Sequence, residues 1–309
     1  MAKVPVVNLR DFTHGSAAER ERFIQAFGDG LQGLGPVAVE GHQVPIDLTH
    51  RVFELAAQFF ALPDESKRRY IVEGGGGERG YTAFGQERAV GARTNDLKEF
   101  WHVGQERSSE AGPQNLWPRE LPTFRHTVLA IYRALEECAL DLLRALAAYL
   151  RLPEPYFADM ARGGESILRI AHYPPVRDAP ENAVRAAEHA NINLLTLRCE
   201  ASTGGLEVHA RDGQWLPIRS QEGQIVCDAG DMLAVVTNGV ISSTTHRVTN
   251  PPQGENKSRY SMPFFVHPRP DVLLAPAPTT VGPEGPKFAP ILAHDFLTER
   301  LKQIGLLGV

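Results

Sequence analysis

The sequence is poor in cysteine, has no long apolar run and carries no surplus of positive charge. Its 309 residues include three cysteines, Cys138, Cys199 and Cys227, which lie far apart and form no Cys-x-x-Cys pair. This spacing argues against a disulfide framework or a cysteine zinc site, and it favours a reducing compartment. The net charge of −5 argues against nucleic-acid binding, which needs a basic surplus. No segment approaches the roughly 18 apolar residues of a membrane span.

Residues 1–5 lack the apolar core of a signal peptide, so we expect a cytoplasmic protein that has no membrane or nucleic-acid partner. In the N-terminal half, a helix is predicted to begin after the N-cap Ser16, because Phe23, Ile24, Phe27 and Leu31 form one apolar stripe. The other elements predicted here are strands at 4–9 and 37–39 and helices at 47–61 and 122–150.

Beyond residue 152 the pattern changes to short strands that are separated by glycine- and proline-rich turns. The predicted strands are 167–172, 193–197, 205–209, 215–217, 224–227, 232–236, 246–248 and 261–267. About eight short strands with regular turn signals are typical of a jelly roll. We therefore predict an α+β fold with a mainly β core, a double-stranded β-helix supported by N-terminal helices. A single domain is expected, with a helical part at 1–152, the jelly-roll core at 153–290 and a C-terminal helix within 291–309.

Two histidines in the β-rich half are candidate metal ligands. Side chains two residues apart on an extended chain point to the same face, so His189 and Asn191 are predicted to lie on one face of their strand. His246 lies on a later predicted strand that closure of a jelly roll can bring near. Arg259 and Ser261 form a second alternating pair, which offers a two-donor guanidinium and a hydroxyl to a carboxylate.

The ordered succession of these segments resembles the iron(II)- and 2-oxoglutarate-dependent oxygenases of the isopenicillin N synthase-like family. The resemblance spans nearly the whole chain. Its main segments are Gly80-Tyr81, Tyr173-Pro174-Pro175, Leu195-Thr196-Leu197, Gly230-Asp231-Met232-Leu233, Thr237-Asn238-Gly239, Thr245-His246-Arg247-Val248 and Arg259-Tyr260-Ser261.

The resemblance implies an iron site of the form His-x-Asp…His, a 2-His-1-carboxylate face with three open positions. His189 and His246 match the two histidines, but Asn191 occupies the carboxylate position. An amide keeps one oxygen donor and loses the negative charge. Two explanations of Asn191 stay open: natural divergence, and a deliberate replacement of Asp that traps an inactive complex. Whether Asn191 ligates the metal is open as well.

The resemblance also implies a co-substrate site. Arg259 and Ser261 match the pair that binds the distal carboxylate of 2-oxoglutarate, and Tyr173 matches a tyrosine that donates to the same group. The implied reaction is hydroxylation or desaturation of a small molecule with O2, which yields succinate and CO2. The implied substrate contacts are Tyr81, Phe84, Trp101 and Phe265.

Two alternatives remain at the level of sequence. The first is an oxidative cyclase that uses the same iron without 2-oxoglutarate, in which Arg259 and Ser261 bind a substrate carboxylate. The second is a pseudoenzyme or ligand-binding protein whose metal site is weakened by Asn191.

Overall fold

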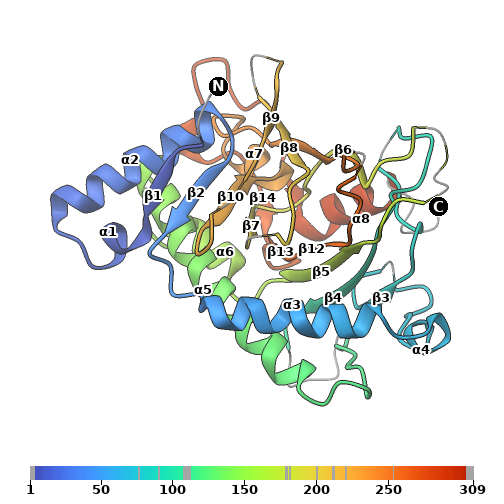
Figure 1. Cartoon of the computed structure of the whole chain (residues 1–309). Coiled ribbons are helices and arrows are strands. Elements are labelled where there is room, and N and C mark those ends of the chain that lie inside the picture. Colours follow the sequence, from blue (N-terminus) through green and yellow to red (C-terminus); the bar gives the residue numbers. More distant parts are fainter. Residues whose placement is uncertain are drawn as a thin grey trace.

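The structure is a computed structural model of the whole chain. It describes residues 4–75, 77–89, 91–106, 113–177, 180, 182–199, 201–210, 213–219, 221–252 and 254–303. Two β-sheets form the centre of the molecule, and helices cover the outer face of the larger one (Figure 1).

The larger sheet has nine strands in the described part of the chain. Its main path runs β1 (Val6–Asn8), β2 (Val37–Glu40), β10 (Ile225–Ala229), β7 (Leu195–Arg198), β13 (Pro263–Val266), β5 (Ile167–Tyr173), β4 (Glu99–Gly104) and β3 (Gly80–Thr82). Strand β12 (Arg259–Ser261) also pairs with β5, which places Arg259 opposite Tyr173.

The smaller sheet contains β6 (Ala186–Ala190), β11 (Thr245–Val248), β8 (Leu206–His209) and β9 (Trp215–Pro217) in that order. A separate two-stranded pair joins β14 (Leu273–Leu274) to β15 (Ile291–Leu292). Together with the larger sheet, this arrangement confirms the predicted α+β jelly-roll fold.

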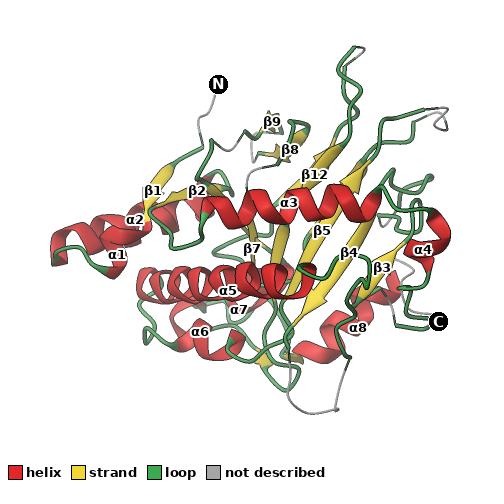
Figure 2. Ribbon diagram, turned by 60° about the horizontal axis from the view of Figure 1, so that its bottom comes forward, coloured by secondary structure: helices red, strands yellow, loops and turns green. Residues whose placement is uncertain are grey.

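Three long helices, α2 (Ala17–Gly33), α3 (Ile46–Phe60) and α5 (Phe124–Tyr149), pack on the larger sheet (Figure 2). Ser16 caps α2 through a reciprocal capping box with Glu19, which confirms the predicted start. The shorter helices are α1 (Leu9–Thr13), α4 (Asp64–Arg68), α6 (Tyr156–Ala161), α7 (Asp231–Val236), α8 (Ala293–Gln303) and the 3-10 turn η1 (Pro278–Thr280). No described helix is both long and apolar enough to cross a bilayer.

Alternation along β7 divides the interior into two zones. Leu195 and Leu197 belong to the main apolar core, which is continuous with the helices. Thr196 and Arg198 have the opposite parity, and their side chains contact residues between the two sheets. The apolar core therefore lies on the helical side of the larger sheet, and polar side chains such as Thr196 and Arg198 lie on the side that faces the smaller sheet.

The predicted strand at 232–236 is wrong, because these residues form α7. Met232, Leu233, Val235 and Val236 are buried at helical spacing, and tertiary packing overrides the β-propensity of valine. The predicted strand at 261–267 is divided at Met262 into β12 and β13. The described part of the predicted terminal helix ends at Gln303, and residue 304 lies outside the described residues.

Candidate active site

His189 and His246 lie directly opposite one another on the paired strands β6 and β11. Their ring centroids are 4.4 Å apart. Each ring directs Nδ1 to the backbone carbonyl two residues earlier, 2.7 Å from the oxygen of Ala187 and 3.3 Å from that of Thr244. A neutral imidazole that donates from Nδ1 has its lone pair on Nε2, which is the form a metal binds.

The surroundings of these rings keep them neutral. Burial lowers the pKa of His189, and the positive charge of Lys98 lowers it further. Burial also holds the pKa of His246 well below its usual value, with additional contributions from His189 and Arg198. Both imidazoles are therefore available as uncharged nitrogen donors at neutral pH.

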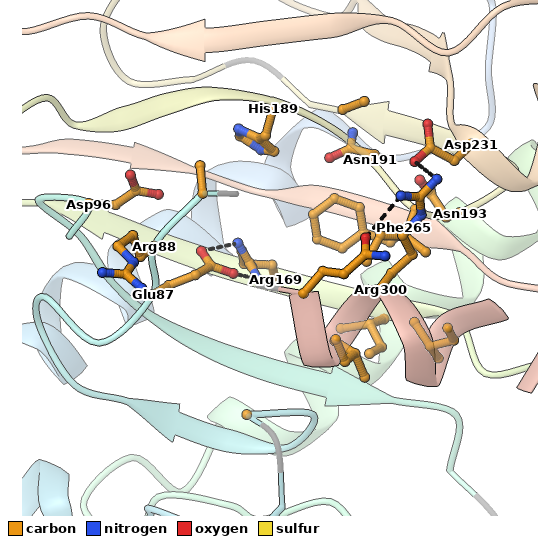
Figure 3. A pocket seen from close by; sticks show the side chains of 18 of the residues that line it. Glu87, Arg88, Asp96, Arg169, His189, Asn191, Asn193, Asp231, Phe265 and Arg300 are labelled. Carbon is orange, nitrogen blue, oxygen red and sulfur yellow. Dashed lines mark hydrogen bonds and ion pairs between the residues drawn. The ribbon is translucent and has the colours of Figure 1, made fainter. Parts of the chain in front are cut away.

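Asn191 follows the end of β6 and is buried. Its Nδ2 donates to the hydroxyl of Thr196 at 2.7 Å, so the amide oxygen is the atom left for the cavity. Figure 3 shows this oxygen on the side of Asn191 that faces His189. The hydrogen bond with Thr196 thus fixes the orientation of the amide, with its oxygen toward the cavity.

The donor set fits a divalent metal. Two imidazoles are held in the tautomer that ligation needs, and an amide oxygen lies beside them. The set is uncharged, however, since no third His, Cys, Asp or Glu joins the two histidines among the residues described. His189, His246 and Asn191 would hold the metal, with less electrostatic attraction than a set that includes a carboxylate.

Arg259 is buried against Tyr173, with its guanidinium carbon 4.9 Å from the centre of the tyrosine ring. Its Nε donates to the carbonyls of Thr203 and Gly204 at 3.2 and 3.1 Å. In the described part of the chain its Nη1 is buried without a hydrogen-bond partner. Ser261 lies two residues further along β12 and is also buried. A buried guanidinium with an unused donor calls for an anion, because leaving that donor unpaired is costly.

Sequence reasoning missed two further arginines in the interior, Arg185, which is buried, and Arg198, which is largely enclosed. Arg185 donates to the carbonyl of Lys257, and its Nε has no partner among the described residues. Arg198 pairs with Asp228 and reaches Nε2 of His246 at 3.2 Å. Burial lowers the pKa of Arg185, and the positive charge of Arg259 lowers it further. Burial also lowers the pKa of Arg259, and the positive charge of Arg198 adds to this shift. We call Arg185, Arg198 and Arg259 the inner arginines.

The signal for Arg198 was present in the sequence. The alternation Leu195-Thr196-Leu197-Arg198 puts the arginine on the same face as Thr196, away from the apolar core. Arg185 carried no comparable signal, because it precedes β6 and its burial depends on contacts with residues about 65–72 positions away, at Asn250 and Lys257.

A cavity of about 420 Å³ opens in front of His189 and Asn191. Its apolar lining includes Ile167, Ile192, Phe265 and Leu297, the last from α8. Figure 3 shows His189 and Asn191 on one side of the cavity and the pair Glu87–Arg169 on another.

Four of the charged groups that line the cavity contact one another, and we call them the mouth cluster: Glu87, Asp96, Lys98 and Arg169. Arg169 makes two hydrogen bonds to Glu87, at 3.0 and 2.9 Å. Lys98 is buried between Glu87, at 2.5 Å, and Asp96, at 2.8 Å. These carboxylates raise the pKa of Lys98 although burial acts in the opposite direction. The mouth cluster is balanced, with two cations and two anions.

The four aromatic residues expected to contact substrate do not meet at the cavity. Phe265 lines it. Trp101 is fully buried in the helical core against Phe59. Tyr81 is buried and donates its hydroxyl to Glu99 at 2.5 Å, whereas Phe84 is exposed. Many of the missed cavity residues come from α8 and the segment 87–98, and others, such as Ile167 and Ile192, come from β5 and the segment after β6.

Comparisons with known proteins agree with this geometry. Residues 4–120 match the family described as non-haem dioxygenase in morphine synthesis N-terminal, and residues 164–268 match the 2OG-Fe(II) oxygenase superfamily. The chain therefore belongs to the 2OG-Fe(II) oxygenase superfamily. Its cofactor is Fe(II), its co-substrate is 2-oxoglutarate, and its class of reaction is oxidation of a small molecule.

Three relatives illustrate the similarity. The "2-oxoglutarate-Fe(II) type oxidoreductase hxnY" of Emericella nidulans is 30% identical, over 97% of this chain and 89% of its own. A crystallised protein of the 2OG-Fe(II) oxygenase family from Caulobacter crescentus is 38% identical, with a TM-score of 0.87 over 98% of this chain and 100% of its own. A full-length Neurospora crassa protein, crystallised in complex with alpha-KG and thymine, is 29% identical, with a TM-score of 0.88 over 97% and 96%.

Proposed function

We propose that this enzyme oxidises a small polar molecule in the 420 Å³ cavity, with Fe(II) held by His189, His246 and Asn191. The observation that carries the proposal is Nη1 of the buried Arg259, which has no hydrogen-bond partner among the described residues. The guanidinium lies close to Tyr173 and feels the charge of Arg198, which contacts His246. A dicarboxylate co-substrate would satisfy this donor with its distal carboxylate.

Different residues bind the co-substrate and surround the metal. Arg259, with Ser261 and Tyr173, binds the distal carboxylate of 2-oxoglutarate, and Arg185 adds a second guanidinium to the same anion. The bound metal supplies activation of O2 and oxidation of the substrate. His246 is buried and is shielded from solvent, whereas His189 is half-buried and faces the cavity where the substrate binds.

The cavity also suggests what the substrate offers. Phe265 and Leu297 give it an apolar wall, and the four charged groups of the mouth cluster are paired with one another. His267 lines the cavity with a buried Nδ1 that has no hydrogen-bond partner within the described residues. We therefore propose a compact molecule with one hydrogen-bonding group directed at His267. Thymine, bound by the Neurospora crassa relative, has this character.

Succinate release tests the function. Purified protein is incubated with Fe(II), ascorbate, 2-oxoglutarate and a panel of small heterocycles, and substrate-dependent succinate is measured. We expect turnover in the wild-type chain, and a loss of at least about 100-fold in co-substrate affinity in Arg259→Leu. Absence of succinate with every substrate, both in the wild type and in Asn191→Asp, would rule the function out. Oxygen consumption without 2-oxoglutarate would instead identify the oxidative cyclase.

We also propose that the chain acts as a single domain in the cytoplasm. The N-terminal strands β1 and β2 continue the sheet of the C-terminal half through pairing of β2 with β10, which supports a single domain. The three cysteines are free and buried, which is typical of proteins in a reducing compartment.

A further inference from the structure

Arg198 lies against one of the two histidines that would hold the metal. Its Nη2 lies 3.2 Å from Nε2 of His246, and its Nη1 pairs with the buried Asp228 on β10. Only 13% of the arginine side chain is exposed, so the guanidinium is enclosed between the sheets.

The direction of this hydrogen bond is fixed by chemistry. A guanidinium only donates, so Nε2 of His246 accepts, and the ring proton is on Nδ1, which faces the carbonyl of Thr244. The lone pair that accepts from Arg198 is the same lone pair that would bind a metal. The two interactions are therefore mutually exclusive.

The charges near the two imidazoles favour the arginine. Asn191 is neutral, whereas Arg198 is a fixed cation whose Nη2 lies against His246; the charge of Lys98 is offset by its partners Glu87 and Asp96. A divalent cation that enters this position meets repulsion that no ligand carboxylate offsets. The pairing with Asp228 keeps the guanidinium in place without an added ion.

We propose that Arg198 competes with the metal for His246 Nε2, so that metal binding requires displacement of the guanidinium. In the metal-free protein Arg198 closes the coordination position, and the affinity for the metal is set by this competition as well as by Asn191. This inference rests on the proposed role of His246 as a metal ligand and adds a residue that tunes it.

Direct metal binding tests the competition without any turnover. Mn(II) is titrated into metal-free protein without 2-oxoglutarate, and free Mn(II) is followed by electron paramagnetic resonance. Because Arg198→Met alone leaves Asp228 as an unpaired buried carboxylate, the main variant is the double change Arg198→Met with Asp228→Asn. We expect it to bind Mn(II) at least about tenfold more tightly than the wild type, a change worth about 1.4 kcal/mol.

Two controls separate competition from other effects. Arg185→Met removes another buried guanidinium that does not contact His246, and we expect its Mn(II) affinity to stay within about twofold of the wild type. Asp228→Asn alone keeps the arginine, and we expect no gain. Thermal melting of each variant shows whether it is folded.

The outcomes distinguish this inference from the proposed function. Unchanged or weaker Mn(II) binding in the double variant, with tighter binding in Asn191→Asp, overturns the competition and leaves the metal site intact. A gain in Arg185→Met equal to that in the double variant also overturns it, since general charge would then explain the effect. If neither Asn191→Asp nor the double variant binds Mn(II), the metal role of His246 fails, and the competition fails with it.

As a second readout, long-range ¹H–¹⁵N spectra of the metal-free protein report on Nε2 of His246. The wild type is expected to show an unprotonated Nε2 that accepts a hydrogen bond, and its shift should change in the double variant. An Nε2 shift that is identical in the two proteins would contradict contact with Arg198.

Discussion

The mouth cluster and the inner arginines are both buried and charged, yet they differ in balance. In the mouth cluster two cations meet two carboxylates, and Lys98 and Arg169 have partners within hydrogen-bonding distance. Among the inner arginines, Arg198 pairs with the carboxylate of Asp228, whereas Nε of Arg185 and Nη1 of Arg259 have no hydrogen-bond partner within the described residues. The difference indicates that the mouth cluster is complete in itself and holds the cavity together, whereas the inner arginines are completed by an anion from outside.

The largest expected effect is on stability, in the mouth cluster. Lys98→Met leaves the buried Asp96 without its cation, while Glu87 keeps Arg169, and we expect a loss of about 3–5 kcal/mol in the free energy of unfolding. Urea denaturation measures it. The control Arg51→Met removes an exposed pair with Glu54 and is expected to cost less than about 0.5 kcal/mol. Similar losses in the two variants would show that the mouth cluster is not structural.

Acid sensitivity should come from the cavity side. Burial lowers the pKa of His267 to about 4, while an unfolded chain leaves it near its ordinary value of 6.5. Between these values the unfolded state binds the extra proton, so stability falls as the pH falls through this window. His267→Gln should remove up to about 3 kcal/mol of this pH dependence. Urea denaturation from pH 7 to 4.5 tests this, and parallel curves for the two proteins would contradict it.

At an inner arginine we expect a loss of co-substrate binding without a loss of stability. Arg185→Met should weaken binding of 2-oxoglutarate about tenfold, because one of two guanidinium groups near the anion is lost. Stability should be unchanged or higher, since an incompletely paired buried charge is removed. Calorimetric titration in the presence of Mn(II), together with urea denaturation, measures the two quantities. Lower stability with unchanged affinity for 2-oxoglutarate would show that Arg185 has a structural role and does not bind the anion.

The smallest effect is expected at the outer end of the cavity. Arg300 on α8 lies 3.6 Å from Asp231, and both side chains are partly exposed. Solvent screens such a pair, so Arg300→Met should change the free energy of unfolding by less than about 0.5 kcal/mol. A loss above about 1 kcal/mol in urea denaturation would show that this ion pair holds α8 in place.

Regular patterns explain what the sequence could predict. The capping box at Ser16 and the stripe of α5 are local, and the alternation of polar and apolar residues marks the strands of the jelly roll. Strands β3 and β4 were not predicted, because Gly80–Thr82 and Glu99–Gly104 are buried on both faces and show no alternation. The valine-rich α7 was predicted as a strand, since its helical state depends on packing.

The candidate site divides in the same way. His189, His246, Arg259 and Ser261 stand in segments whose ordered succession resembles the family, so they could be selected as candidates from the sequence. The mouth cluster could not, because Arg169 lies 82 positions from Glu87 and the two meet only in the folded chain. The placement of Trp101 in the helical core likewise follows from the pairing of β4 with β5.

Thr196 lies close to both unusual features of this site, the amide of Asn191 in the carboxylate position and the contact of Arg198 with His246. Its hydroxyl accepts from Nδ2 of Asn191 at 2.7 Å and lies 3.2 Å from Oδ1 of Asn193, to which it donates. A carboxylate at position 191 has no hydrogen to give, so it would compete with Asn193 for the proton of this hydroxyl. Two residues further along β7, Arg198 restrains His246. The effect of Asn191→Asp on metal affinity is therefore expected to depend on the residues at positions 193 and 198. The order in which these three positions change then constrains how a site with Asn191 and a site with an acidic ligand can interconvert.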